Sequence, residues 1–547
     1  MSPVRFALAP TLLRSLAVGT ALIAGAVLPG ATAFADEPAG TTVVGQLVQA
    51  WPEVAHGEPE VDGPISWVQN PDGDAVRIPT DSVNGIPAGS TVRVTVGAED
   101  GGTAEDPLHQ VHDAEIVAPA PVDPVLRDQA GLTNHVTVVR VAPAGAARDD
   151  VTVQQLVGLV DGPVADFWSE QSNGTISVGV GTTVHDWVTP VAGCTDPTAL
   201  WNEVAAAVGF VPGPREHLML YVSSKATDCA YALAEVGSSP ATGGRLYVRD
   251  TSASVIAHEL GHNFGLGHSS GQQCDAAVES ATCTTTAYRD YYDVMGVSWA
   301  RLGSLNAPQA ARLGVLPAAQ QQALTVQSGA TTVTLAPFAS RTGTRALRLT
   351  DTDGVDYWLE YRTATGRDAW LGTTENRYHL QSGVLLRKAG GLPDTSLLLD
   401  GTPSPASAWA TDLQETLSVG ATVPVSGSDF SVVVRSEDAN GAVLSVTPTP
   451  PAAPATKAPR PAAAAPQVLP GSGSGSGAEA PAPQVGATPG FWAPSYEAPH
   501  AVPATPALAS AADSTSLSAF LLPLAGAALA GSTLLVVAGM RRRARRA

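Results

Sequence analysis

Residues 258–268 read His-Glu-Leu-Gly-His-Asn-Phe-Gly-Leu-Gly-His, and the interpretation of the whole chain starts from this stretch. Residues four apart in a helix lie on one face, so His258 and His262 can both present an imidazole nitrogen to one metal ion. Gly265 can adopt the left-handed conformation that ends a helix, which lets the chain turn and bring His268 back as a third ligand. The spacing therefore predicts three histidine ligands from one short helix and the turn after it.

Glu259 follows the first histidine and lies beside the open coordination position, where a zinc ion holds a water. Three neutral imidazoles leave the full charge on the zinc, which lowers the pKa of that water, and the Glu259 carboxylate can take the proton and deliver it to a leaving amine. A helix with incidental surface histidines is the weaker interpretation, because the chain has only 11 histidines and the pattern fixes five positions. The stretch predicts a hydrolase site with one Zn²⁺ ion.

Residues 291–296 read Tyr-Tyr-Asp-Val-Met-Gly and contain Met295, one of four methionines in the chain. With residues 258–268, this segment resembles the metzincin metallopeptidases, in which a methionine on a tight turn forms an apolar floor under the metal. The residues of both motifs are most similar to those of the gametolysin (autolysin) family. A core methionine in an ordinary loop is the alternative interpretation.

The similarity to gametolysins extends to 306–314, 358–362 and 383–386 and covers about residues 132–445, strongly in the middle and weakly at the ends. It implies zinc on the three histidines, Glu259 as the general base and Met295 in the turn. It also implies an α/β catalytic domain, a twisted sheet plus the active-site helix, which we place at 132–322. By the same resemblance, a strand at 244–249 is the sheet edge that binds the substrate backbone antiparallel. The substrate itself is not implied.

Periodicity within 132–322 agrees with this fold class. Apolar or alternating runs predict strands at 136–141, 176–180 and 218–222. Helical spacing predicts helices at 153–169, despite Pro163, and at 197–208.

Short alternating runs broken by turns follow at 323–447 and predict an antiparallel β-sandwich, which aids substrate binding or only stabilises the catalytic domain. Asp351, Asp353 and Asp356 form an acidic cluster there. It could hold Ca²⁺, but a solvated hairpin turn is the favoured interpretation.

All four cysteines, Cys194, Cys229, Cys274 and Cys283, fall within 132–322. An even number in an exported chain favours two disulfides, and of the three arrangements the simplest joins Cys194 to Cys229 and Cys274 to Cys283. A cysteine-based zinc site is the weaker interpretation because no Cys-x-x-Cys spacing is present.

The first 35 residues have the form of a signal peptide, with Arg5 and Arg14 before an apolar run and a small-x-small cleavage site at 33–35. A retained N-terminal anchor is the alternative. Residues 36–131 look β-rich and, placed before a metallopeptidase domain, predict a propeptide that folds alone and keeps the site closed. No cysteine lies between 36 and 193, so the blocking ligand is not a thiolate. A carboxylate, His109 or His112, or steric cover remain open.

Residues 448–512 are rich in proline, alanine, glycine and serine and predict an extended linker. At 513–547 an apolar run, 517–540, precedes a tail of arginines, which predicts a membrane-spanning helix with a cytoplasmic end. Residues 522–526 also resemble a degenerate sortase signal, so covalent attachment to a cell wall is the alternative. Both place the enzyme at the cell surface.

The net charge of −20 argues against nucleic acid or an anionic membrane surface as a partner. The sequence thus predicts an exported, surface-tethered zinc endopeptidase acting on extracellular proteins or peptides. A non-catalytic surface adhesin on the same scaffold is the alternative from another class, and intact Glu259 with all three histidines speaks against it. A metal-dependent hydrolase of a non-peptide bond is a third interpretation.

Overall fold

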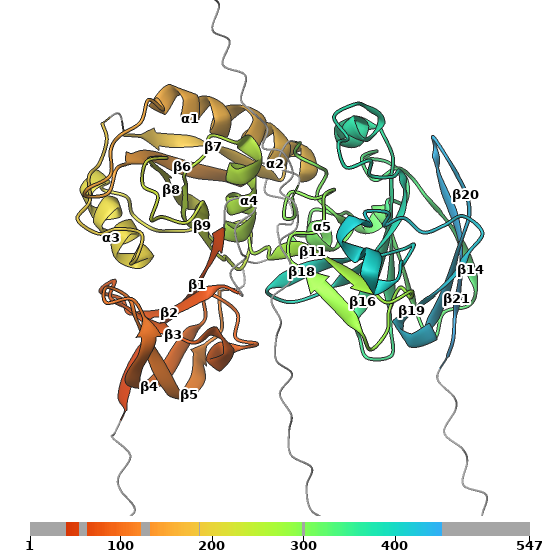
Figure 1. Cartoon of the computed structure of the whole chain (residues 1–547), viewed down its shortest axis with the longest axis horizontal. Coiled ribbons are helices and arrows are strands. Elements are labelled where there is room, and N and C mark those ends of the chain that lie inside the picture. Colours follow the sequence, from red (N-terminus) through yellow and green to blue (C-terminus); the bar gives the residue numbers. More distant parts are fainter. Residues whose placement is uncertain (1–39, 54–62, 122–131, 185, 298–300, 451–547) are drawn as a thin grey trace, which may run out of the picture. The chain divides into compact units, whose positions relative to one another are not determined.

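The computed structural model describes residues 40–53, 63–121, 132–184, 186–297 and 301–450, which form a mixed α/β structure of three sheets and a few short helices (Figure 1). The signal peptide, the linker and the C-terminal anchor expected from the sequence lie outside these residues. No helix in the described part of the chain combines the length and apolar character needed to cross a membrane.

The largest sheet has ten strands in the order β2-β3-β5-β4-β1-β9-β10-β8-β6-β7. Its catalytic half runs parallel except for β9, and its N-terminal half is mostly antiparallel. The strands are β1 (Thr41–Glu53), β2 (Ile65–Gln69), β3 (Ala75–Ile78), β4 (Thr91–Gly102), β5 (Pro107–Ala118), β6 (Leu132–Val141), β7 (Ile176–Thr183), β8 (Glu216–Val222), β9 (Ala232–Glu235) and β10 (Gly244–Val248).

Three helical segments and the active-site helix pack with the catalytic half of this sheet. The helix expected at 153–169 is present but interrupted: α1 (Val153–Leu159) and α2 (Ala165–Gln171) are separated by a π-helical turn at Val160–Val164. Pro163, which has no N–H to donate, and the non-helical Gly162 explain the interruption. α3 (Pro197–Val208) begins at the Asp196 cap and ends at left-handed Gly209.

The active-site helix α4 (Ala253–Asn263) is buried along its length. Its residues Ile256 and Leu260 belong to a core shared with Trp168 of α2 and Leu246 of β10. A helix that is buried nearly all round is held by its packing, so the side chains that it presents have fixed positions.

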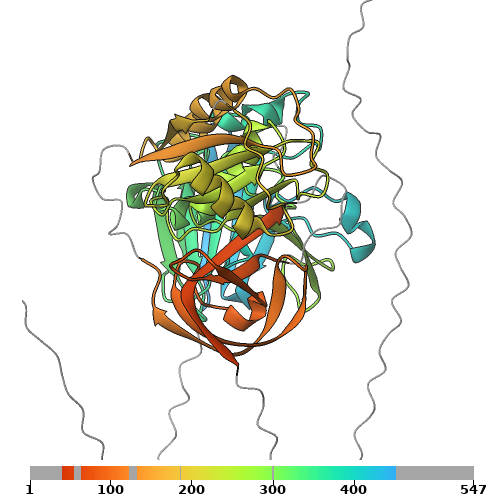
Figure 2. The same ribbon diagram turned by 90° about the vertical axis from the view of Figure 1, so that its left-hand side faces the viewer.

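The N-terminal β-region has an apolar core of its own, which includes Leu47, Val68 and Val92, and one of its strands also joins the catalytic sheet. β1 pairs with β4 at Thr41–Gln46 and with β2 at Gln46–Ala50, and its end, Ala50–Glu53, pairs antiparallel with β9. Figure 2 shows this strand in red, running from the N-terminal strands into the catalytic sheet. One continuous strand therefore belongs to both halves.

The strand at 244–249 is not the sheet edge, so that expectation is wrong. β10 is internal, hydrogen-bonded to β8 on one side and to β9 on the other. β9 is the last strand of the catalytic half, and β1 covers its outer side. With only four residues and no polar alternation, β9 gives almost no strand signal in the sequence.

Two further sheets follow. One has seven strands in the order β12-β11-β18-β17-β16-β15-β13, and the other has four in the order β14-β21-β20-β19. They are built from β11 (His268–Cys274), β12 (Cys283–Thr286), β13 (Gln321–Thr325), β14 (Thr331–Leu335), β15 (Ala346–Thr350), β16 (Asp356–Arg362), β17 (Gly383–Ala389), β18 (Asp394–Leu399), β19 (Thr422–Val425), β20 (Phe430–Asp438) and β21 (Gly441–Pro448).

The two C-terminal sheets share one apolar core, as in a sandwich, with Leu347 and Leu359 from one and Leu335 and Leu444 from the other. They are not purely antiparallel as expected, because β11–β18 and β13–β15 are parallel pairs. In addition, β11 and β12 come from the segment directly after the active-site helix. The sheet therefore reaches back to the metal-binding motif.

The remaining helices are short. α5 (Ala307–Arg312) lies within the expected 306–314 segment and is capped by Asn306. The 3₁₀ turns are η1 (Thr80–Val83), η3 (Ala318–Gln320), η4 (Gly366–Gly372), η5 (Ala406–Thr411) and η6 (Ser426–Ser428).

Two disulfides join Cys194 to Cys229 and Cys274 to Cys283, the arrangement expected as the simplest. The second closes the β11–β12 hairpin, where its two residues are directly paired.

The acidic cluster at 351–356 forms a hairpin turn. Asp351 accepts hydrogen bonds from the backbone N–H groups of Asp353 and Val355, at 2.9 and 2.8 Å, and from the Ser426 hydroxyl at 2.7 Å. Its carboxylate is therefore occupied by protein donors.

Candidate metal centre

The first two predicted ligands come from consecutive turns of α4. The Nε2 atoms of His258 and His262 lie 3.1 Å apart, and both side chains are buried. Because two neutral imidazoles gain nothing from such an approach unless they share a proton or an ion, this convergence is the geometry of a chelating pair.

The third ligand arrives through the predicted turn. Gly265 has a φ of +95°, in the left-handed region, and α4 ends just before it. Two residues of α5 hold the turn: Arg312 Nε donates to the Gly265 carbonyl at 2.8 Å, and Gln309 Nε2 donates to the Gly267 carbonyl at 3.2 Å. The ring of His268 then lies 4.9 Å from that of His262, centre to centre. All three histidines converge.

Backbone carbonyls fix the orientation of two of the rings. Nδ1 of His258 donates to the Val294 carbonyl and Nδ1 of His262 to the Leu266 carbonyl, each at 2.8 Å. A proton held on Nδ1 leaves Nε2 with its lone pair free for a metal. Burial lowers the pKa of His268 to about 3, although Glu53 opposes this, so its ring is in the neutral form that binds metal.

A carboxylate from the N-terminal region completes the cluster. Glu53, the last residue of β1, places Oε1 at 3.3 Å from Nε2 of His258, 3.4 Å from Nε2 of His262 and 3.1 Å from Nε2 of His268. One ligand atom from each of these four residues lies within 4.8 Å of the others. His109 and His112, the histidines considered as blocking ligands, lie on β5 instead.

Sequence reasoning left a carboxylate open as a blocking ligand but did not identify Glu53. Residues 36–131 contain many acidic side chains, and nothing local distinguishes this one. The strand pairing with β9 is what selects it.

Glu259 lies on the next position of α4, beside this cluster. Its side chain is fully buried, and neither of its carboxylate oxygens has a hydrogen-bond partner among the described residues. Burial raises its pKa well above the ordinary value, and the nearby Glu53 carboxylate raises it further. A buried carboxylate with no donor is costly in an apolar core but suits a position beside a metal ion and its water. The residues present therefore fit a zinc ion.

Met295 lies against the helix that carries the ligands. A β-carbon placed on Gly261 would overlap the Met295 sulfur, so the glycine leaves room for this side chain. Three hydrogen bonds hold the turn in place. The Asp293 carboxylate accepts from the Met295 N–H at 2.8 Å and from the Asn306 N–H at 2.6 Å. The Met295 carbonyl accepts from the Ser269 N–H at 2.8 Å. Met295 therefore packs against the helix that carries two of the three histidines.

A buried ionic network supports the Met-turn and was not expected from the sequence. Arg387 of β17 forms an ion pair with Asp290 and, at 3.0 Å, with Glu360 of β16. Glu360 also pairs with Arg362 at 2.9 Å, and all four side chains are fully buried. A buried charge is tolerated only when it is paired and hydrogen-bonded, so these residues tie the Met-turn to the C-terminal sheet.

Tyr288 was also missed. Its ring centre lies 3.9 Å from that of His268, and its backbone has a φ of +57°, which non-glycine residues rarely adopt. It packs against the metal site from the side of the Met-turn.

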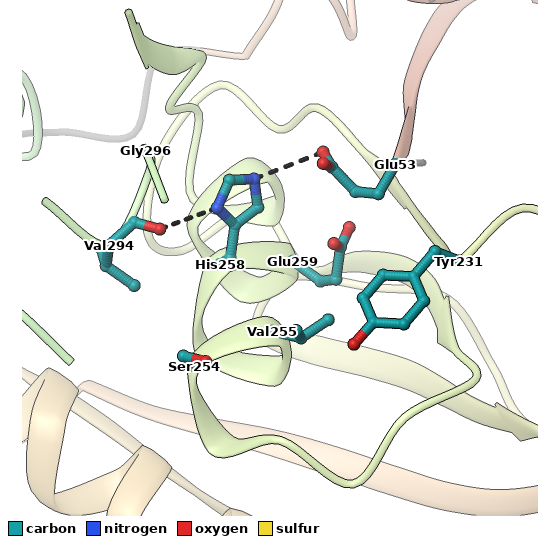
Figure 3. A pocket seen from close by; sticks show the side chains of 8 residues that line it. All are labelled: Glu53, Tyr231, Ser254, Val255, His258, Glu259, Val294 and Gly296. Atoms are coloured by element: carbon teal, nitrogen blue, oxygen red, sulfur yellow. Dashed lines mark hydrogen bonds and ion pairs between the residues drawn. The ribbon is translucent and has the colours of Figure 1, made fainter. Parts of the chain in front are cut away.

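A small cavity of about 20 Å³ lies beside the centre (Figure 3). Val255 of α4 and Val294 of the Met-turn line it, with Tyr231, Ser254 and Gly296, and Glu259 and His258 face it.

Comparison with known proteins gives one family. Residues 222–269 match the reprolysin-like metallopeptidase family M12B, over a segment that holds β9, β10, α4 and the third histidine. The comparison with curated proteins gives no match.

Comparison with solved structures adds little to the family match. One matching structure, described as "Structure of a chaperone-substrate complex", shares 13% identity with this chain at a TM-score of 0.17. The alignment covers 37% of this chain and 32% of that one, so less than two thirds of that chain's length is spanned. A likeness this low says nothing about the fold or activity of this protein.

The matched segment and the geometry point to the same class. A family M12B match over the motif and a buried cluster of three histidines and a glutamate support a zinc metallopeptidase domain in this chain.

Proposed function

We propose that this chain is a zinc endopeptidase of the metzincin type, similar to the gametolysin family, that hydrolyses extracellular proteins. One observation carries the proposal: the Nε2 atoms of His258, His262 and His268 converge while the carboxylate of Glu259, which has no hydrogen-bond partner among the described residues, lies beside them. A structural histidine cluster has no need of a buried acid without a hydrogen-bond donor.

The roles of the residues follow from where they lie. A zinc ion held by three imidazoles lowers the pKa of a bound water and polarises a carbonyl group. Glu259 accepts the proton of the attacking water and returns it to the leaving amine. Val255 and Val294 form apolar walls for a substrate side chain in the adjacent cavity. Met295 supports the ligand helix and takes no part in proton transfer.

Export and surface attachment are part of the proposal on the basis of the sequence. The signal peptide at 1–35 directs the chain out of the cell, and the segment at 513–547 holds it there through a membrane helix or a wall linkage. The linker at 448–512 separates the folded part from that anchor. Two disulfides agree with an oxidising location.

The test uses a peptide library derived from a proteome. The full zinc-loaded chain, both as purified and after limited trypsin treatment followed by inactivation of the trypsin, is incubated with the library. New peptide termini should appear and should vanish with a chelator, and a Glu259→Gln chain treated in the same way should produce none. A zinc-containing chain that cleaves no peptide in either preparation would contradict the peptidase and favour the adhesin.

A further inference from the structure

The end of β1 lies where an extended peptide would join the catalytic sheet. Ala50, Trp51, Pro52 and Glu53 pair antiparallel with Glu235, Ala234, Leu233 and Ala232 of β9. Strand addition of this kind supplies backbone hydrogen bonds without regard to sequence, which is how sheet edges bind peptides. The edge beside the metal centre is therefore filled by a segment of the same chain.

Alternation along β1 sends its side chains to two faces. Ala50 faces the core that contains Leu233 and Tyr247. Trp51 and Glu53 face the metal site: the Trp51 ring lies 4.3 Å from that of His268, edge to face, and is 3% exposed. These two side chains fasten the strand end to the centre.

Glu53 occupies the space that the reaction needs. Its Oε1 atom lies 3.1 to 3.4 Å from all three Nε2 atoms, at the point where a metal ion held by them would take a fourth ligand. Figure 3 shows its carboxylate and the His258 ring pointing toward one another from separate elements. A carboxylate oxygen is a regular zinc ligand, and with it in place neither a water nor a substrate carbonyl can take the open position.

We propose that β1 is a built-in inhibitor of the metal centre, with Glu53 as the fourth ligand and Trp51 as its anchor. This inference rests on the proposed zinc peptidase. The chain is then latent until the end of β1 leaves the β9 edge. The rest of β1 is held by β2 and β4, so release requires that the N-terminal β-region be cleaved or displaced.

The test reads the metal's surroundings directly. In a full-length Glu259→Gln background, which prevents self-cleavage, Co²⁺ replaces zinc and the visible absorption spectrum is recorded for the parent, for Glu53→Gln and for Glu99→Gln. Glu99 is an exposed glutamate of β4 and serves as the matched control. Glu53→Gln should change the position and intensity of the cobalt bands, and Glu99→Gln should not.

A second measurement is the binding of acetohydroxamate to the same chains. If Glu53 competes for the open position, its removal should tighten binding by about tenfold or more, since the site is then accessible for a larger fraction of the time. Trp51→Ala should act in the same direction. If Glu53→Gln does not fold, Glu53→Asp shortens the side chain, keeps the charge and should give the same spectral change.

Two results separate this inference from the proposed function. Unchanged spectra and equal hydroxamate binding in the parent and in Glu53→Gln would overturn Glu53 as a ligand, even if the Glu259-intact chain cleaves peptides. Changed spectra with no hydrolysis by any Glu259-intact chain, including Glu53→Gln, would instead remove the peptidase and leave the ligand assignment standing.

Discussion

Gly261 and Met295 are in direct contact: the helix that carries the metal ligands has no side chain at the point where the Met-turn presses against it. An added β-carbon would overlap the Met295 sulfur, and Trp168 lies 3.6 Å from the same position. The contact between α4 and the Met-turn fixes the positions of His258 and His262 relative to His268. That third histidine lies outside the helix, at the start of β11.

Gly261→Ala should therefore destabilise the protein, although alanine favours a helix by up to about 1 kcal/mol over glycine. Overpacking a filled core costs about 1–3 kcal/mol, which outweighs that gain. Gly158→Ala is the matched control, since Gly158 lies in α1 with open space around it and should give a small stabilisation. Urea unfolding of both variants measures the difference, and an equal gain in stability in both would mean that Met295 leaves room for a β-carbon at Gly261.

Met295→Leu should lower the free energy of unfolding by less than about 1.5 kcal/mol, because the two side chains have similar volumes.

Glu259→Gln and His262→Ala should separate proton transfer from metal binding. The glutamine keeps the size of the side chain but not its basicity, so zinc should stay near one per chain while hydrolysis falls by a factor on the order of 10² to 10⁴. His262→Ala should lose both metal and activity, together with some stability. Metal content by elemental analysis and peptide hydrolysis rates on the activated chain are the measurements. A Glu259→Gln chain that cleaves at the parent rate would rule out the mechanism.

The two disulfides should contribute unequally to stability. The loops they close span 35 and 9 residues, for which the loop-entropy relation gives about 3.8 and about 2.6 kcal/mol at 25 °C. Replacing Cys194 and Cys229 by alanine should therefore lower the free energy of unfolding more than replacing Cys274 and Cys283. Alkylation of the folded protein without reduction should label none of the four. Labelling of two or more would contradict the pairing.

Glu415 should make stability fall as the pH rises. Burial, together with the nearby Asp400 carboxylate, raises the pKa of this carboxyl from 4.5 to about 8. The folded chain then holds a proton that the unfolded chain has lost, so the stabilisation is complete below about pH 4.5 and disappears as the pH rises through about 8. Glu415→Gln cannot titrate, and its stability relative to the parent should increase across this window. Urea unfolding at several pH values tests this, with exposed Glu99→Gln expected to show no such trend.

Deleting residues 517–547 should release the protein into the medium, because this segment holds the proposed anchor. Immunodetection in cell and medium fractions measures the release. Retention of the truncated chain on the cells would exclude both forms of attachment. Mass spectrometry of wall fragments distinguishes the two, since only the sortase route ends the mature chain within 522–526.

Local patterns predicted the parts of the fold that local physics determines. The i, i+4 histidines, the glycine turn and the 197–208 helix each depend on a few neighbouring residues, and the structure has the same elements there. Strands β6 and β8 were found because strands buried on both faces form continuous apolar runs, and β7 because its apolar residues alternate with small ones.

Contacts between residues far apart in the sequence could not be predicted from local patterns. The Glu53 carboxylate meets His262 and His268 across 209 and 215 residues, and Arg387 meets Asp290 across 97. Nothing near Glu53 or Arg387 in the sequence marks either residue as part of the site. The edge position was assigned to the wrong strand for the same reason, since β9 is too short to give a period and its partner lies near the N-terminus.

The position of His268 has a consequence for the time at which the site forms during synthesis. This histidine begins β11, a strand that is held in parallel by β18, and the preceding Gly267 N–H donates to the Thr395 hydroxyl, 128 residues further along the chain. A ribosome must therefore complete most of the folded part before the third imidazole reaches its place. Until then the growing polypeptide has two ligands on one helix and an incomplete centre. Glu53 is synthesised long before, so its carboxylate is already available when the third imidazole reaches its place.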